Sequence, residues 1–161
     1  MKNRTLFWIF FLLIPLSKGA PLGDEVPDDS VIVLQRHTCE RHCPVYRVTL
    51  FGDGTVIYFG QYYVRRMGVV LGHVDREAFQ KLVETAKRID YFNLKSEYGY
   101  HETSGCEYRI PDGPIVSISV TVGSQSHGVI HHHRCGGSIP AQLTEFEDEI
   151  ERVANIARFT K

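Results

Sequence analysis

The chain has 161 residues, of which 43% are hydrophobic and 23% are charged. This composition is typical of one globular domain and excludes a disordered chain or a protein with several membrane spans. Its 18 Lys and Arg nearly balance its 19 Asp and Glu, so it lacks the basic excess of a general nucleic-acid binder.

The first twenty residues have the layout of a secretory signal peptide. Two basic residues precede an apolar run, Leu6–Ile14, and small residues follow it. A membrane anchor is the alternative, but a spanning helix needs about 20 apolar residues, and Pro15 and Lys18 interrupt this run. We therefore expect residues 1–19 to be removed, which would leave a periplasmic or secreted protein with no stable membrane anchor.

A short acidic stretch follows the leader. Residues 20–30 hold four acids, two prolines and few apolar groups, and such a composition cannot bury enough surface to order itself. We expect a flexible acidic linker there, followed by a single α+β domain over residues 31–161. Removal of the leader takes three basic residues and no acid, which leaves a net charge of −4.

The first half of the domain predicts an antiparallel meander. Two β-rich runs flank the Gly-Asp-Gly step at 52–54, a strong hairpin signal. The expected strands are Val31–Arg36, Val45–Phe51, Thr55–Phe59, Tyr62–Val64 and Val69–Leu71. A helix should then start at Asp75, which can cap its first turn. Its apolar face repeats at helical spacing: Phe79, Leu82, Val83, Ala86 and Ile89.

The second half predicts a hairpin and a closing helix. Ile115–Val122 alternates apolar and polar residues, as a strand with one wet face does. Gly123 and Ser124 mark a tight turn before its partner, Gln125–Arg134. The closing helix begins near Pro140. Its expected buried stripe is Leu143, Phe146, Ile150, Val153 and Ala157, and its acids are Glu145, Glu147, Asp148, Glu149 and Glu151.

We interpret these acids as a solvated helix face, with attraction of a basic partner as the alternative. The order strands, helix, hairpin, helix predicts an α+β fold. Its antiparallel sheet should have about five strands, packed by two helices.

All four cysteines lie in the part expected to be exported: Cys39, Cys43, Cys106 and Cys135. An even number in an oxidising compartment indicates disulfides, with three pairings open. A zinc site made of these thiolates is the alternative, but zinc sites use short paired spacings on both sides, and the last two cysteines are far apart.

Histidine is the unusual feature of the sequence, because four of the eight fall between positions 127 and 133. On a strand, His127, His131 and His133 would share one face. The last two would lie roughly 6.5 Å apart, within reach of one metal ion such as zinc. His101 or Glu102 could complete such a site.

The register of the hairpin decides where these imidazoles point. A two-residue turn places His127 and His131 on the side of Val120 and Val116, and a three-residue turn places them on the wet side. Two other interpretations stay open: an imidazole-rich polar strand without a metal, and a cluster whose charge changes near neutral pH.

Residues 93–114 show neither helical nor strand periodicity. Irregular segments of this length are typically functional, held in place by a disulfide, or disordered. Tyr98, Tyr100 and Tyr108 lie there and could form a binding surface or seal the loop over the core. The sequence shows no elbow serine, paired carboxylates, phosphate-binding glycine loop or catalytic cysteine.

Four short motifs resemble a bacterial domain-of-unknown-function family numbered 6438. They are Cys39–Tyr46 (C-x3-C-P-x-Y), Gly52–Val56 (G-D-G-x-V), Tyr91–Leu94 and Pro140–Leu143. The resemblance covers residues 31–157. It implies an exported bacterial protein with a Cys39–Cys43 disulfide, which leaves Cys106 to pair with Cys135. The family brings no established activity, and the histidine cluster departs from its common pattern.

We therefore expect an exported, disulfide-stabilised domain that binds a protein or a small molecule without catalysis and without a required cofactor. The alternatives are a metal-binding protein that uses the histidine cluster, with zinc or another divalent ion, and an enzyme of unrecognised type.

Overall fold

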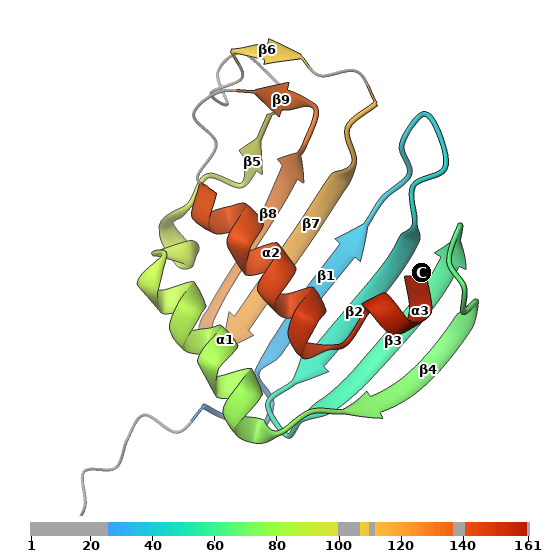
Figure 1. The fold of residues 1–161 in the computed structure, drawn as a ribbon. Helices are drawn as coiled ribbons and strands as arrows, with labels where there is room; N and C mark the ends of the chain where they lie inside the picture. The colour runs from blue at the N-terminus through green and yellow to red at the C-terminus, as the bar shows by residue number, and fades with distance from the viewer. Residues whose placement is uncertain (1–25, 100–106, 110–111, 137–140, 161) are drawn as a thin grey trace, which may run out of the picture.

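The computed structural model describes residues 26–99, 107–109, 112–136 and 141–160. The predicted signal peptide lies outside these ranges. The elements in chain order are β1 (Val31–Arg36), β2 (Val45–Phe51), β3 (Thr55–Tyr62), β4 (Gly68–His73), α1 (Arg76–Arg88), η1 (Tyr91–Asn93), β5 (Glu97–Tyr98), β6 (Tyr108–Arg109), β7 (Ile115–Val122), β8 (Gln125–His132), β9 (Cys135–Gly136), α2 (Ala141–Val153) and α3 (Ala157–Thr160) (Figure 1).

The main sheet has seven strands in the order β4-β3-β2-β1-β7-β8-β5. All neighbours are antiparallel except β5, which pairs parallel to β8. The mixed α+β fold is confirmed, but the expected five strands are too few. One strand that was not expected, β5 at the β8 edge, has two residues, too short for any alternation to reveal it. The short strands β6 and β9 form a separate pair.

At the other edge, the expected strand Tyr62–Val64 does not form, and β4 is longer than the expected Val69–Leu71. Tyr62 ends β3, and Tyr63 has a positive φ of 52°, which turns the chain instead of extending it. Gly68, with a φ of 80°, then opens β4.

The helices α1, α2 and α3 lie on one face of the sheet, and α2 runs obliquely across the strands from β8 toward β2 (Figure 1). The face they cover supplies the core residues of the strands, among them Ile32, Leu34, Val48 and Ile118. The helix expected from Asp75 forms and buries Phe79, Leu82 and Val83, but the Asp75 side chain makes no capping hydrogen bond. None of the described helices is long and apolar enough to cross a membrane.

The closing helix is shorter than expected. It ends at Val153, and Asn155 takes a left-handed conformation with a φ of 51°. This turn interrupts the helical hydrogen bonds, so Ala157 starts a separate helix, α3, and is exposed instead of buried in the predicted stripe.

Candidate functional site

Helix α2 buries a carboxylate in the core. Glu147 is four residues after Leu143 and three before Ile150, so its side chain falls on the same helix face as these two apolar residues. It is 0% exposed. The interpretation of Glu147 as part of a solvated acidic face is therefore wrong, because its position on the helix, not the charge of the run, decides which way it points.

The β7–β8 hairpin settles the register. Val122 pairs with Gln125 across a two-residue turn, so Val120 faces His127 and Val116 faces His131. Both imidazoles consequently point to the face covered by the helices, as the first of the two predicted registers requires.

The structure brings His131 and His133 together but keeps His127 apart. Four residues along a strand span roughly 13 Å, and His127 packs instead against Tyr91, with 5.7 Å between ring centroids. His132 points to the opposite face, where its Nε2 lies 3.2 Å from Glu97 Oε1. The other predicted contributors, His101 and Glu102, lie outside the described residues.

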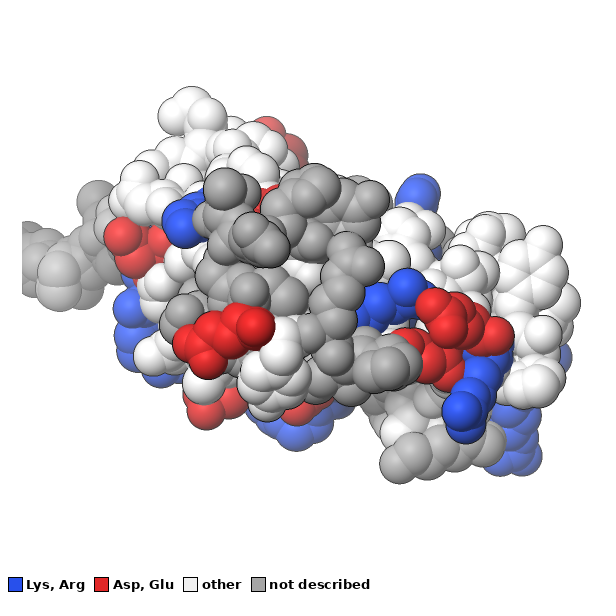
Figure 2. All heavy atoms as spheres, turned by 90° about the horizontal axis from the view of Figure 1, so that it is seen from above, with Lys and Arg blue, Asp and Glu red and all other residues white. Residues whose placement is uncertain are grey.

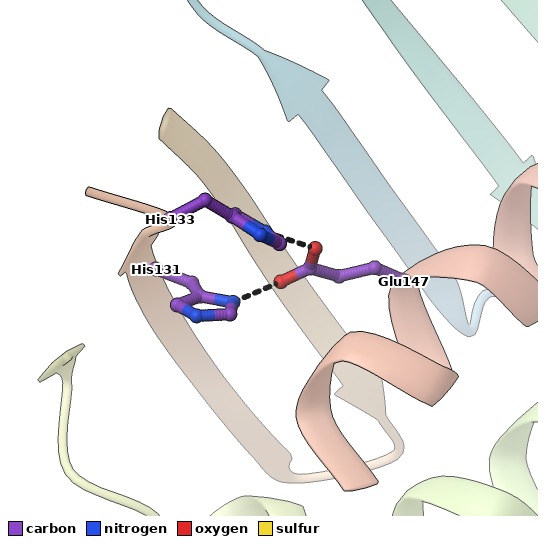
Figure 3. A group of neighbouring side chains, drawn as sticks. All are labelled: His131, His133 and Glu147. Carbon is purple, nitrogen blue, oxygen red and sulfur yellow. Dashed lines mark hydrogen bonds and ion pairs between the residues drawn. The ribbon is translucent and has the colours of Figure 1, made fainter. Parts of the chain in front are cut away.

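Glu147 is the member of the cluster that the sequence analysis missed. Its Oε1 lies 2.6 Å from Nδ1 of His131, and its Oε2 lies 2.7 Å from Nε2 of His133. Figure 3 shows the carboxylate reaching from α2 to the edges of the two rings, with one oxygen toward each. The ring centroids are 4.0 Å apart. We call these three residues the His–Glu cluster.

The cluster is buried from one side and reachable from the other. The side chains of His131 and Glu147 are 3% and 0% exposed, whereas that of His133 is 22% exposed. Burial raises the pKa of Glu147, but the hydrogen bonds from the two imidazoles lower it by more, so its pKa lies below the usual value. The carboxylate is therefore ionised at neutral pH, and each of its oxygens accepts one imidazole N–H.

One turn further along α2, a second carboxylate contacts different strands. Glu151 Oε1 accepts hydrogen bonds from Arg36 Nε of β1, at 2.6 Å, and from the hydroxyl of Tyr46 of β2, at 2.5 Å. Burial and then the charge of Glu151 raise the pKa of Tyr46. Because α2 crosses the strands obliquely, Glu147 contacts β8, and Glu151, one turn later, contacts β1 and β2.

The tyrosines that could form a binding surface are not equivalent. Tyr98 is 7% exposed and belongs to the core, where its hydroxyl accepts a hydrogen bond from the Lys95 amide. Tyr108 is 62% exposed, and Tyr100 lies outside the described residues.

A family model described as "Domain of unknown function (DUF6438)" matches residues 30–154. The chain belongs to this family. The match covers most of the chain and confirms the predicted family. A search of curated proteins finds no match.

The DUF6438 domain of this chain carries the Cys39–Cys43 disulfide that the resemblance implied, in the segment between β1 and β2. None of the described cysteines is a free thiol. Cys106 lies outside the described residues, so its pairing with Cys135 stays a prediction.

The face of the sheet away from the helices offers a different kind of site. On β3 and β4 it carries Phe59, Val69 and Leu71, which are 40%, 63% and 72% exposed. Tyr62, Tyr63 and Met67, around the turn between these strands, are also more than half exposed. Figure 2 shows uncharged side chains gathered at this end of the molecule. A hollow of about 420 Å³ lies further along the same face, lined by residues that include Val33, Gln35, Arg47, Ser96, Ser117 and Ile130.

Proposed function

We propose that this DUF6438 domain is an exported, non-catalytic binding domain that binds a protein through the outer face of β3 and β4. The observation that carries the proposal is the row of large apolar side chains, Phe59, Val69 and Leu71, on a face that the described helices leave uncovered. Contiguous exposed apolar surface is typical of interaction sites.

The register makes these side chains one surface. Phe59 pairs with Val69, and Ile57 pairs with Leu71. Directly paired residues on one face of a sheet are in contact distance. We call these four residues the β3–β4 patch. Their neighbours along the strands point to the core, so the apolar character of the patch is not needed to build the core.

Another strand of the same sheet provides the contrast. On β7 the uncovered face carries Ser117, Ser119 and Thr121, the polar side chains expected where an antiparallel sheet faces water. Most of the exposed large apolar residues that the structure describes therefore lie on β3, β4 and the turn between them, and Ile130 of β8, 43% exposed, is an exception on the same face.

The edge itself favours a protein partner. Among the described residues no strand pairs with the outer edge of β4, and an edge strand can add an extended segment of another chain by main-chain hydrogen bonds. Export is supported by the leader pattern and agrees with the Cys39–Cys43 disulfide, because disulfides persist in oxidising compartments.

Site-specific photocrosslinking in the native organism tests the proposal. A photoreactive amino acid at Leu71 should give a defined protein adduct, which mass spectrometry identifies as another protein or a second copy of this chain. The same amino acid at Glu84, an exposed position of α1 on the opposite face, should give none.

The variant Leu71→Ser separates binding from stability. Leu71 is exposed, so the substitution should change the free energy of unfolding by no more than about 0.5 kcal/mol. In a chain with the crosslinker at Val69, it should strongly reduce the adduct. Absence of any adduct from either position, or equal adducts from Leu71 and Glu84, would contradict the proposal.

A further inference from the structure

We propose that the His–Glu cluster binds one divalent transition-metal ion of the zinc class. This inference is independent of the β3–β4 patch, because the cluster lies on the opposite face of the sheet. His131, His133 and Glu147 each offer one ligand atom, and these atoms lie within 4.8 Å of one another. Two imidazoles and one carboxylate are a donor set that zinc accepts, with a remaining position for water.

The present hydrogen bonds are close to the geometry that an ion requires. Zinc binds imidazole nitrogen and carboxylate oxygen at about 2.0–2.2 Å, which puts neighbouring ligand atoms roughly 3.3 Å apart. The carboxylate oxygens now lie 2.6 and 2.7 Å from Nδ1 of His131 and Nε2 of His133. An ion could take the place of the two imidazole protons if the carboxylate moved back by roughly 0.6 Å and the three ligand atoms, now within 4.8 Å of one another, converged on it.

Two of the three ligands come from rigid elements. His131 belongs to β8, and Glu147 lies in the middle of α2, between Phe146 and Ile150, both fully buried. An apolar residue at position 147 would complete this buried stripe without the cost of removing a charge from water. The chain instead places a carboxylate there, aimed at two metal-ligating side chains.

The Arg36 guanidinium, which the charge of Glu147 also influences, does not compete for Glu147. Arg36 donates from Nε to Glu151 at 2.6 Å, and Tyr46 donates to the same oxygen. Because Glu151 neutralises Arg36, the negative charge of Glu147 is balanced by the two imidazoles, or by an ion that replaces their protons.

The cluster also has an entry side. His133 lies just beyond the end of β8, and its side chain is 22% exposed. Figure 3 shows Glu147 reaching from α2 toward His131 and His133 on the sheet side. An ion can therefore reach the site past His133 without unfolding the core.

Zinc titration of the full chain, produced without a histidine tag, tests the inference. Isothermal calorimetry and elemental analysis after dialysis should give about one equivalent of zinc, and zinc should raise the melting temperature. Glu147→Gln, which keeps the shape of the side chain, should weaken zinc binding at least about tenfold and remove the thermal shift. His133→Asn, at the more exposed ligand, should do the same.

His73→Ala is the matched control. His73 is an exposed histidine of β4, away from the cluster, and its removal should leave zinc binding unchanged. If Glu147→Gln fails to fold, His133→Asn decides alone. The inference is overturned if the folded wild-type chain takes up no zinc, if the two ligand variants bind it as tightly as the wild type, or if His73→Ala abolishes binding.

Discussion

The carboxylate of Glu147 lies 2.6 Å from the Nδ1 atom of His131, and both side chains are almost completely removed from solvent. This polar contact inside the core joins α2 to β8, the last long strand of the sheet. One turn later Glu151 joins the same helix to Arg36 and Tyr46 on β1 and β2. The oblique path of α2 over the sheet is thus held by two carboxylates as well as by its apolar stripe.

Replacement of Glu151 by Ala should destabilise the domain. Arg36 and the Tyr46 hydroxyl would each lose a partly buried charged acceptor, and hydrogen bonds to charged groups contribute about 1.5–3 kcal/mol each before the variant relaxes. We expect a loss of about 2 kcal/mol in the free energy of unfolding, measured by urea denaturation.

Glu149→Ala is the control for this prediction. Glu149 pairs at 3.6 Å with Arg152, whose side chain is 72% exposed, and such surface pairs contribute about 0.5 kcal/mol or less. Equal losses for Glu151→Ala and Glu149→Ala would show that the Glu151 contacts do not stabilise the fold.

Alkaline pH should destabilise the domain through its buried tyrosines. Tyr91 is fully buried and donates its hydroxyl to the Ile118 carbonyl at 2.9 Å, and burial raises its pKa. In the unfolded chain a tyrosine has a pKa of about 10. The stabilisation is therefore complete below about pH 10 and is lost as the pH rises further, because the unfolded chain releases the proton first.

The variant Tyr91→Phe isolates this effect. It should cost about 1 kcal/mol at neutral pH, since the Ile118 carbonyl loses its donor, but it should lose less stability than the wild type between about pH 8 and about pH 11. Urea denaturation at both pH values measures the difference. Parallel losses in the two proteins would mean that Tyr91 does not carry the alkaline sensitivity.

The Cys39–Cys43 disulfide should contribute little stability. Its two cysteines are four residues apart, and closing so short a loop is worth about 2 kcal/mol at most in the chain-entropy model. The double variant Cys39→Ser and Cys43→Ser should therefore still fold, with its urea midpoint only modestly lowered. A chain that no longer folds would assign this disulfide a larger role than loop closure gives it.

Periodicity in the sequence predicted most of the sheet and the first helix, because alternation and helical spacing report directly which face is buried. It could not predict β5, since two residues pairing parallel to β8 leave no pattern. It also extended the last helix to Ala157, because the left-handed turn at Asn155 has no signal in the apolar spacing.

The candidate site was predicted in part. Strand alternation grouped His131 with His133, but it could not exclude His127, which shares their face and lies too far along β8. Glu147 was missed because its charge was given more weight than its position. Its spacing from Leu143 and Ile150 was the available signal, and it would have pointed this carboxylate at the core.

The most direct test of the metal site is a crystal structure of the chain grown with zinc, with anomalous diffraction measured at the zinc absorption edge. We predict one strong peak about 2.0–2.2 Å from the ligand atoms of His131, His133 and Glu147. A cluster that keeps its two short hydrogen bonds, with no zinc peak between the three side chains, would contradict the account.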